Sequence, residues 1–547
     1  MSAPPPPRMR WWGWGEDGHA AGLPAAAEAM LESELGAGLQ RTPRVEFEAV
    51  ELPEPNVPED LAAALAQAVG KDNVRDDRLT RVSHAAGRSY PDLFRLRSGK
   101  LEAAPDAVVY PDTHEEVAAV IDACDRAGAA IVPFGGGTSV VGGVEPLAGG
   151  KQAAITLDLA RMDRLLDSDE RSLTATFEPG VTGPDAERLL GERGLTLGHF
   201  PQSFEYATIG GFVATRSAGQ ASTGYGRIDE LVLGLRCATP AGELRVAAHP
   251  ASAAGPALRE LLVGSEGALG VITEATLAVR PIPKARRYEA WALRSFAEGA
   301  EALRALEQSG AAPDVTRLSD EQETQMSLAL SATGSLKDRA GRAYLRLRRR
   351  RGGALAIFGW EGDAERVAER RAATVPLLRE AGAVALGQGA GRSWLRGRYA
   401  GPYLRDELLD RGVFVETLET ATSWTNLDNL YAAVGDALRS TLAGRGTPPL
   451  VICHISHLYR SGASLYFTFL ARSEAGAELD QWHAAKSAAC DAIIAAGGTI
   501  THHHAVGRDH APWMTGEVGA LGVDALRALK QRLDPNGVMN PGKLLAA

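Results

Sequence analysis

The stretch AAIVPFGGGTSVVGG, residues 129–143, places three consecutive glycines directly after an apolar run that is typical of a buried strand. Successive glycines let backbone N–H groups turn inward to bind an anion, and Thr138 and Ser139 add hydroxyl donors. The loop does not match the G-x-G-x-x-G pattern, which fails at Val140, and no Gly-Lys-Ser/Thr follows as in a P-loop. By itself the loop is therefore either an anion-binding site or a tight turn.

A strand and a helix precede this loop. DAVVYPDT (106–113) is typical of a short strand ended by proline, and HEEVAAVIDACDRAG (114–128) shows the periodicity of a helix. Thr113 with Glu116 predicts a capping box, and Gly128 a C-terminal stop. The expected buried face consists of Val117, Val120, Ile121 and Cys124. A strand–helix–strand unit thus leads into the glycine loop.

The pattern of elements divides the chain into four parts. Further strands are expected at 153–159, 173–180 and 270–283, and strands and helices alternate again beyond them. The parts are a helical N-terminal extension (1–100), an α+β domain (101–283), a second α+β domain (284–500) and a C-terminal segment (501–547).

Length and charge exclude some classes of protein. A chain of 547 residues exceeds what one hydrophobic core normally supports, so at least two domains are expected. A net charge of −10 argues against a nucleic-acid binder, whose binding surface would be basic. The concentrated basic run RLRRRR, Arg346–Arg351, is either a solvated helix face or a contact with anionic lipid.

The cysteines and the N-terminus indicate the compartment. The four cysteines are scattered without CxxC spacing, which is typical of free thiols in a reducing compartment. The N-terminus has prolines where a signal peptide needs an apolar run, and no stretch reaches about 18 apolar residues. We expect a cytoplasmic protein that touches the inner face of a membrane at most peripherally.

Two more segments share the composition of the glycine loop. PQSFEYATIGGFVATRSAGQASTGYGRIDE (201–230) mixes hydroxyl residues with paired glycines, and GSEGALGVIT (264–273) is another glycine turn that enters a strand. Three such segments in one domain are hard to explain as turns alone. They are typical of a surface that holds a large planar ligand.

With these segments, residues 100–283 resemble the FAD-binding domain of flavoproteins of the vanillyl-alcohol oxidase and p-cresol methylhydroxylase type. The resemblance implies a two-domain α+β fold with an α+β cap. Some of these proteins carry the flavin covalently on a loop histidine, but this loop offers Thr138 and no histidine, so noncovalent FAD is expected. The cofactor-binding residues implied are Pro133, Phe134, Gly135, Gly136, Gly137, Thr138, Ser139, Gln202, Ser203, Thr208, Gly210, Gly211, Arg216, Ser217, Ala218, Gly219, Glu266, Gly267, Ala268, Leu269, Gly270, Val271 and Ile272.

One branch of these flavoproteins oxidises 2-hydroxy acids and carries H-x-G-D-G-N and G-E-H-G motifs, which hold a divalent metal in many members. Here HLYRSGASLYF (457–467) and THHHAVG (501–507) stand at the comparable places, and both motifs are altered. The altered motifs resemble the alkyldihydroxyacetonephosphate synthase family, which forms the ether bond of ether lipids. The resemblance runs nearly end to end through WWGWG (11–15), LGHFPQSFEYATIGGFVATRSAG (197–219), VTRLSD (315–320), YLRDELLDRGVFVETLET (403–420) and Trp513 after the histidine triplet.

This resemblance implies that the acyl chain of acyl-dihydroxyacetone phosphate is exchanged for a long-chain fatty alcohol through a flavin N5 adduct, without net redox change. It also implies lipid-like substrates, a homodimer and no nucleic-acid partner. Two departures keep an alternative open: Gln202 stands where an acidic residue is usual, and MNPGKLL (539–545) is closer to the hydroxy-acid dehydrogenases. The alternative is an FAD-dependent dehydrogenase or oxidase of a 2-hydroxy acid such as D-lactate.

Tyr466 is the acid–base residue that the resemblance implies. It lies in the expected strand SLYFTFLAR (464–472), where alternation sends it to the face opposite Leu465 and Phe467. A tyrosine with a pKa of about 10 is a poor base unless cations or hydrogen bonds lower that pKa, and a cluster of histidines could do so. The alternative is a strand tyrosine that caps the core.

The triplet His502, His503 and His504 is expected at the same site. In an extended segment neighbouring side chains point to opposite faces, so at most two of them could bind one metal ion. No Cys, Asp or Glu stands at metal-ligand spacing beside them. We predict hydrogen-bonding roles around flavin and phosphate and no metal, with a metal site or a surface loop as the alternatives.

Two arginines are candidates for anion binding, because a guanidinium is bidentate and stays charged. Arg405, with Thr417, is predicted to bind the substrate phosphate, and Arg317 to lie near the flavin ring as a catalytic residue. For either one the alternative is a surface salt bridge. His199 is either an active-site donor or a packed loop histidine.

Overall fold

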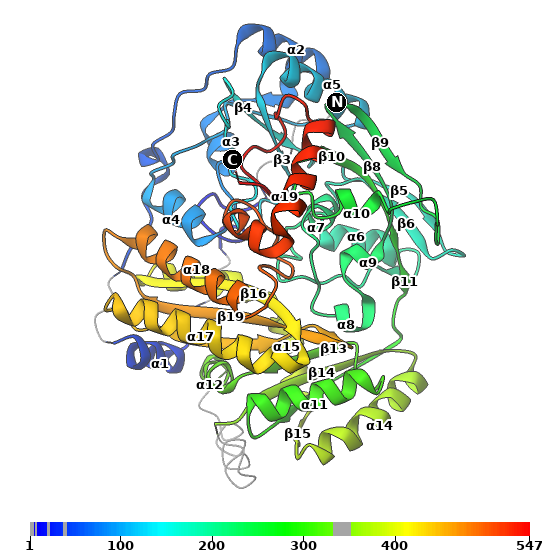
Figure 1. The fold of residues 1–547 in the computed structure, drawn as a ribbon, viewed down its shortest axis with the longest axis vertical. Coiled ribbons are helices and arrows are strands. Elements are labelled where there is room, and N and C mark those ends of the chain that lie inside the picture. Colours follow the sequence, from blue (N-terminus) through cyan, green and yellow to red (C-terminus); the bar gives the residue numbers. More distant parts are fainter. Residues whose placement is uncertain (1–4, 6–7, 19–21, 37–40, 332–351, 547) are drawn as a thin grey trace.

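The computed structural model describes residues 5, 8–18, 22–36, 41–331 and 352–546. Two sheets form the upper half of the molecule and one large sheet forms the lower half, with helix α19 (Met514–Leu533) against the upper half (Figure 1). The basic run Arg346–Arg351 lies outside the described residues. Within the described ranges, no helix combines the length and the apolar character needed to cross a membrane.

The predicted strand–helix–strand unit forms the first sheet. The strand order is β1 (Val74–Arg75), β2 (Ala107–Val109), β4 (Ala154–Asp158) and β3 (Ala130–Phe134), parallel except for the β1–β2 pair. Thr113 caps the N-terminus of helix α5 (His114–Ala127), and Gly128, which follows its last residue, has a left-handed backbone conformation. The predicted capping box is only half formed, because the Glu116 carboxylate accepts from the Asp112 N–H and not from that of Thr113.

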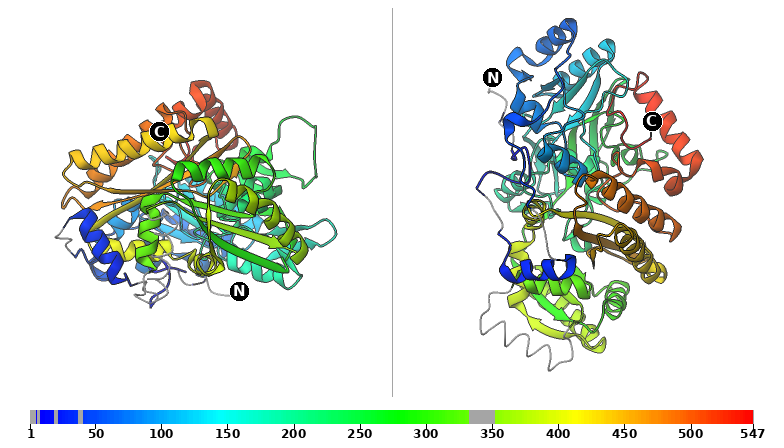
Figure 2. Two further views of the ribbon diagram at one scale, coloured as in Figure 1. Left: turned by 90° about the horizontal axis from the view of Figure 1, so that it is seen from below. Right: turned by 90° about the vertical axis from the view of Figure 1, so that its left-hand side faces the viewer.

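The N-terminal extension contains the expected helices but also contributes strand β1. Its helices are α1 (Ala25–Leu35), α2 (Glu59–Val69), α3 (Arg78–Ser83) and α4 (Tyr90–Ser98). Leu61 and Leu65 of α2 pack in one apolar cluster with α5. Helix α1 instead packs on the large sheet in the lower half, as Figures 1 and 2 show.

The second sheet of the upper half is antiparallel and has five strands. Its order is β5 (Leu165–Asp169), β6 (Thr174–Phe177), β10 (Val271–Ala278), β8 (Val232–Thr239) and β9 (Gly242–Val246). A separate pair joins β7 (Leu195–Thr196) to β11 (Arg280–Pro281). The helices here are α6 (Gly183–Gly191), α7 (Ile209–Ala214), α8 (Ser222–Tyr225), α9 (Ile228–Leu231) and α10 (Arg259–Leu262).

The large sheet of the lower half is antiparallel throughout. Its order is β15 (Val384–Gly387), β12 (Ala285–Ala292), β14 (Leu355–Gly362), β13 (Val315–Ser319), β17 (Leu450–Ile455), β19 (Gly462–Arg472) and β16 (Val413–Ser423), with β18 (Leu458–Tyr459) paired to β19. Phe358 and Phe467 share one apolar cluster with the helices α11 (Phe296–Gln308), α14 (Ala364–Glu380), α17 (Leu427–Gly444) and α18 (Glu478–Ala495). The elements α12 (Glu321–Leu330), α15 (Gln388–Gly397) and α16 (Gly401–Leu409) complete the half.

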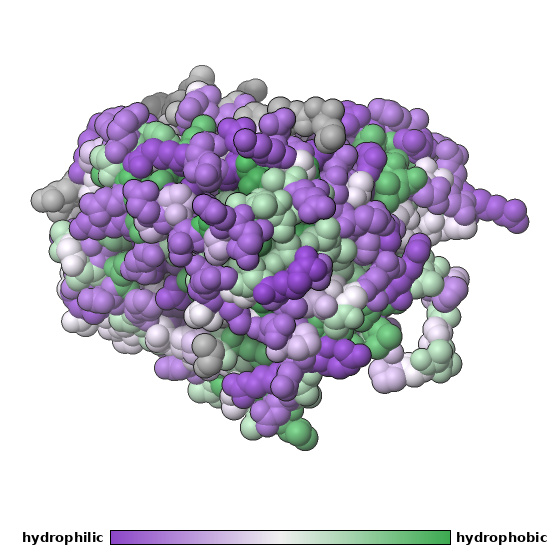
Figure 3. All heavy atoms as spheres, turned by 90° about the horizontal axis from the view of Figure 1, so that it is seen from above, coloured by the Kyte–Doolittle hydropathy of each residue, from purple (hydrophilic) through white to green (hydrophobic). Residues whose placement is uncertain are grey.

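The C-terminal segment returns to the first sheet. The N–H of Ile131 in β3 donates to the carbonyl of Val538, and the N–H of Asn540 donates to the carbonyl of Ile131. The chain end therefore extends the sheet beside the glycine loop. All four cysteines are free and buried, as predicted for the thiols. The face seen in Figure 3 is mostly hydrophilic, with separate hydrophobic patches between charged side chains.

Gly136 makes the closest approach in the glycine loop. A Cβ at this position would lie 2.0 Å from the backbone oxygen of Tyr206, so the loop rests directly on the backbone of the second glycine-rich segment. Only glycine allows this contact, and neither backbone can yield cheaply.

We expect Gly136→Ala to separate these two segments and to lower the flavin content of the purified protein, measured by visible absorbance. Gly191→Ala is the control, because a Cβ there meets nothing within 4 Å and the residue is helical. Alanine is favoured over glycine in a helix by about 1 kcal/mol. Equal flavin content in the two variants would contradict the role of this contact.

Candidate active site

The glycine loop has the geometry of an anion cradle. Gly137 is left-handed at φ +64°, and a Cβ on Gly135 would lie 2.4 Å from Oγ1 of Thr208. In the part of the chain that the structure describes, the backbone N–H groups of residues 135–138 donate no hydrogen bond to protein. Free N–H groups on a loop without room for side chains suit a bound phosphate, so the residues fit a dinucleotide cofactor.

The other predicted cofactor segments adjoin this loop. Thr208 caps helix α7 by accepting from the Gly211 N–H, and a small cavity beside Gly135, Gly136 and Gly137 is also lined by Arg88. The amide nitrogen of Gln202 is buried without a partner among the described residues, which suits a ligand contact. Arg216 is instead engaged by Asp229 and Glu260, while residues 268–272 are buried in the turn into β10.

The polar face of the large sheet carries the predicted acid–base residue. Tyr466 in β19 is paired with His454 in β17 on one side and with Glu419 in β16 on the other. Directly paired residues share a face, so these side chains form one row, opposite the buried Phe467. The prediction that Tyr466 faces away from Leu465 and Phe467 is confirmed.

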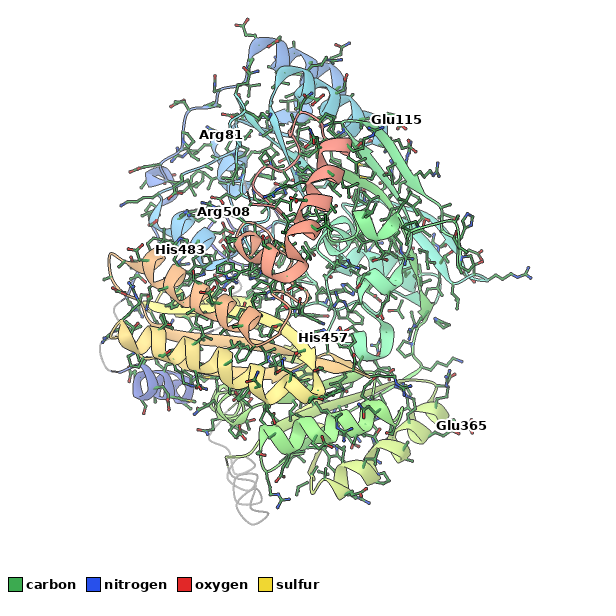
Figure 4. The ribbon with its side chains drawn as sticks, viewed as in Figure 1. Arg81, Glu115, Glu365, His457, His483 and Arg508 are labelled. Carbon is green, nitrogen blue, oxygen red and sulfur yellow. The ribbon has the colours of Figure 1, made fainter. Side chains whose placement is uncertain are left out.

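The histidine triplet lies over this row. Tyr466 stacks on His454 with ring centroids 4.7 Å apart and on His503 at 5.9 Å, while His504 stands edge-on to it at 5.4 Å. Figure 4 places His457 near the centre of the molecule, where the upper and lower halves meet. Its ring lies 5.2 Å from that of His503.

Glu419 holds the triplet in place. Its buried carboxylate accepts from the backbone N–H groups of His502 and His504, and from the hydroxyl of Thr501 at 2.7 Å. Burial acts to raise the pKa of Glu419, but the imidazoles of His503 and His504, which become charged only in acid, and these hydrogen bonds lower it to about 2. The carboxylate is therefore charged at neutral pH.

The triplet does not have the extended geometry expected from the sequence. Residues 502–504 form a bend, and the ring centroids of His502–His503 and His503–His504 are 5.1 and 4.8 Å apart. The prediction that neighbours point to opposite faces is wrong, because the hydrogen bonds to Glu419 fold the backbone and gather the rings.

The histidines around Tyr466 are neutral. Burial lowers the pKa of His503 to about 3, and lowers those of His457 and His502 well below the ordinary value. Burial raises the pKa of Tyr466 to about 12, although Thr417 and Arg405 act in the other direction. The prediction that the histidines lower the pKa of Tyr466 is wrong, since neutral imidazoles supply no positive charge.

Three histidines are close enough to hold a metal ion, since His457 joins two members of the triplet. One ring nitrogen each of His457, His502 and His503 lie within 4.8 Å of one another. The nitrogens of two of them are already used: Nε2 of His457 donates to the Gly219 carbonyl at 3.1 Å, and His502 contacts His503 and the hydroxyl of Tyr459. A metal would have to displace these bonds.

The two predicted anion-binding arginines differ in their partners. Arg317 donates to the carboxylate of Glu323 at 2.7 Å and to Nδ1 of His454 at 3.0 Å, so its charge is compensated. Arg405 donates from Nη1 to the backbone carbonyl of Arg88 at 2.6 Å, and its Nε is buried without a partner. Among the described residues Arg405 forms no ion pair, so it keeps free donors for an anion.

His199 lies with the cofactor segments, within electrostatic reach of His457 and His503. Its Nε2 is 2.5 Å from Oγ of Ser217, and its ring packs edge-on against Phe212. Burial lowers the pKa of His199 to about 3. Nδ1 has no protein partner within the described residues, so the ring both packs and retains one open nitrogen.

Comparisons with known proteins agree with this geometry. Residues 105–248 match the family model described as FAD binding domain, and residues 282–544 match FAD linked oxidases, C-terminal domain. The chain is 34% identical over 514 residues to the alkyldihydroxyacetonephosphate synthase of Dictyostelium discoideum, covering 93% of this chain and 84% of that protein. The chain belongs to the alkyldihydroxyacetonephosphate synthase family.

Solved structures confirm the fold. An alkyldihydroxyacetonephosphate synthase superposes with a TM-score of 0.86 at 31% identity, covering 98% of this chain and 99% of that chain. A p-cresol methylhydroxylase, at 15% identity and a TM-score of 0.67 over 90% of this chain and 98% of its own, shares the fold alone. The predicted FAD-binding fold with an α+β cap is therefore confirmed, and so is FAD as the cofactor.

Several residues of the site are not predicted by patterns in the sequence. Glu419 lies inside one of the motifs that carry the family resemblance, but only its pairing with Tyr466 on the adjacent strand places it at the site. His454 and Tyr459 contact predicted residues but lie at sequence distances that no local pattern connects, while Glu323 lies six residues after Arg317, just beyond the motif VTRLSD.

We expect Glu419→Gln to destabilise the protein by about 3–5 kcal/mol, as breaking a buried charged network does. Because the folded pKa is about 2 and the unfolded value about 4.3, the carboxylate's contribution is full above about pH 5 and falls as the pH drops toward 2. Urea unfolding should therefore show a larger gap from wild type at pH 7 than at pH 3.5. Glu369→Gln, at an exposed position, is the control.

Proposed function

We propose that this chain exchanges the acyl chain of acyl-dihydroxyacetone phosphate for a long-chain fatty alcohol, with release of the fatty acid. Family membership supports this reaction, and so does the arrangement of Tyr466 among neutral imidazoles beside an arginine with free donors. One carbon–oxygen bond to the carboxylate breaks and one to the alcohol forms. Neither substrate is oxidised or reduced in sum.

FAD fits the cradle formed by the three glycine-rich segments. The free N–H groups of residues 135–138 would hold its phosphates, and the buried, unpartnered amide of Gln202 and Nδ1 of His199 are further donors or acceptors for it. When bound, oxidised FAD supplies an electrophilic ring beside the substrate. We propose noncovalent attachment, since Thr138 stands in the loop and no histidine does.

Arg405 is the residue that we assign to the substrate phosphate. It has no carboxylate partner among the described residues, whereas Arg317 is neutralised by Glu323. A guanidinium with open donors binds a phosphate bidentately at any working pH. Thr417 lies on the same polar face of the sheet and hydrogen bonds with Tyr466, so it connects the phosphate site to the acid–base site.

Tyr466 is the acid–base residue of the proposed reaction. Because its pKa is raised, its hydroxyl is protonated at neutral pH and must pass that proton on before it accepts one from the substrate carbon. His504 is neutral, is edge-on to Tyr466, and is the acceptor that we assign. The substrate carbon that gives up this proton carries two hydrogens again in the product. The proton therefore returns from His504 through Tyr466 to that carbon.

The finer features of the protein rest on the resemblance. We propose the boundaries 1–100, 101–283, 284–500 and 501–547 for the extension, FAD domain, cap and C-terminal segment. We also propose a homodimer in the cytoplasm, in peripheral contact with the inner face of the membrane that supplies its lipid substrates. The buried free cysteines support a reducing compartment.

Incubation of the FAD-loaded protein with acyl-dihydroxyacetone phosphate and hexadecanol tests the function. Mass spectrometry should detect alkyl-dihydroxyacetone phosphate and free fatty acid in equal amounts. Anaerobic mixing with D-lactate separates the alternative: rapid bleaching of the flavin without ether product would establish a 2-hydroxy-acid dehydrogenase or oxidase instead.

Tyr466→Phe deletes the hydroxyl and keeps the ring between His454 and His503. Turnover should fall by about 10² to 10⁴, the usual contribution of an acid–base group, while FAD content and melting temperature persist. Steady-state ether formation measures the loss. A fully active Tyr466→Phe would remove the tyrosine from the mechanism.

Metal chelation should leave ether formation unchanged. The ring nitrogens of His457 and His502 are occupied by protein partners, so hydrogen bonding and not metal binding is the role that we propose for them. Dialysis against EDTA, followed by an assay with and without added zinc, checks this. Activity abolished by EDTA and restored by zinc would overturn the metal-free proposal.

A further inference from the structure

Four side chains from separate parts of the sequence form one hydrogen-bonded chain that ends at the triplet. Arg227 at the start of α9 hydrogen bonds with Tyr459 in β18. The hydroxyl of Tyr459 lies 2.6 Å from Nε2 of His502, and Nδ1 of His502 lies 2.8 Å from Nδ1 of His503. These bonds join the upper half to the lower half directly and end in the C-terminal segment.

The first member fixes the direction of every bond. A guanidinium has donors and no acceptor, so Arg227 must donate to the oxygen of Tyr459. Within the described residues the hydroxyl of Tyr459 has one acceptor for its own proton, Nε2 of His502. Burial raises the pKa of Tyr459, so that proton is present at neutral pH.

The direction of these bonds then determines which ring nitrogen of each imidazole carries the proton. His502 is neutral and accepts at Nε2, so its single ring proton is on Nδ1 and is donated to Nδ1 of His503. His503 is neutral as well, and its proton is left on Nε2. Without the fixed donor at the far end, both tautomers of each ring would satisfy the His502–His503 bond equally.

We propose that Tyr459 is a positioning residue that, held by Arg227, sets the tautomers of His502 and His503 so that His503 presents Nε2–H to the substrate. This inference rests on the proposed function. In that reaction the carboxylate leaves with an electron pair, and a donor fixed in advance at the developing charge lowers the barrier. Tyr459 itself does not touch the substrate.

The tautomer can be measured without turnover. ¹⁵N NMR of histidine-labelled, FAD-loaded protein distinguishes protonated from unprotonated ring nitrogens, with His503 assigned by its loss in His503→Gln. Wild type should show Nε2 protonated and Nδ1 unprotonated. Tyr459→Phe, which keeps the ring and removes the O–H, should give mixed tautomers, and so should Arg227→Gln, which removes the obligatory donor.

Kinetics and a matched control complete the test. Tyr459→Phe should lower kcat by about 10- to 100-fold with little change in KM, less than loss of a direct proton-transfer group. Tyr288→Phe is the control, since Tyr288 is a buried tyrosine whose hydroxyl donates to Glu361 at 2.5 Å, away from the triplet. It should lose similar stability and keep its activity and the His503 tautomer.

Two results would overturn the proposal. One is a wild-type His503 protonated on Nδ1, and the other is a Tyr459→Phe variant with the tautomer and kcat of Tyr288→Phe. The NMR result stands whether or not ether product forms, so failure of the proposed function would leave the tautomer assignment intact.

Discussion

Two buried carboxylates, one from each half of the molecule, accept hydrogen bonds from the backbone of the C-terminal segment. The position of the histidine triplet depends on these bonds. Glu419 of the large sheet accepts from the N–H groups of His502 and His504, and Glu266 of the third glycine-rich segment accepts from those of Val506 and Gly507. Glu419 is charged at neutral pH, and hydrogen bonds to a charged acceptor are about twice as strong as neutral ones, whereas burial raises the pKa of Glu266 to about 7. Six consecutive residues are thereby tied to both halves of the molecule, which leaves the imidazole rings, and not the backbone, facing the site.

The distribution of charge follows from this burial. Several imidazoles can share one small volume only because none of them is protonated, since burial lowers the pKa of His503 to about 3. The site therefore has hydrogen-bond donors and acceptors in quantity but few free charges. Of the two predicted arginines, Arg317 is compensated by Glu323, so Arg405 is the one with donors open to an anionic substrate. A phosphate would enter a site whose histidines are neutral and whose other charges already have partners: Arg317 is paired with Glu323, and Glu419 accepts from the backbone N–H groups of the triplet.

Local patterns in the sequence predicted what depends on neighbouring residues. The glycine loop, the helix after Thr113 and the strand face on which Tyr466 lies all follow from periodicity or from backbone sterics. The structure contains all three. The bend of residues 502–504 was not predictable in this way, because its cause is Glu419, more than 80 residues earlier. The histidine tautomers likewise depend on Tyr459, which no spacing rule connects to the triplet. Strand register decides such contacts, and a single sequence does not reveal register between distant strands.

The tryptophan- and glycine-rich motif at residues 11–15 likewise makes contacts with residues far along the sequence, and these contacts hold helix α16 in place. The N–H of Trp14 donates to the Asp406 carboxylate at 2.7 Å, and a Cβ on Gly13 would lie 2.5 Å from that carboxylate, so glycine is needed there. Arg88 donates from its side chain to the carbonyl of Gly13 at 3.0 Å and accepts from Arg405 at its own carbonyl. Helix α16 is thus fixed from both sides of the residue that we assign to the phosphate. Because a guanidinium recognises phosphate by direction as well as by charge, a segment near the start of the chain determines the geometry of an anion site some 390 residues later.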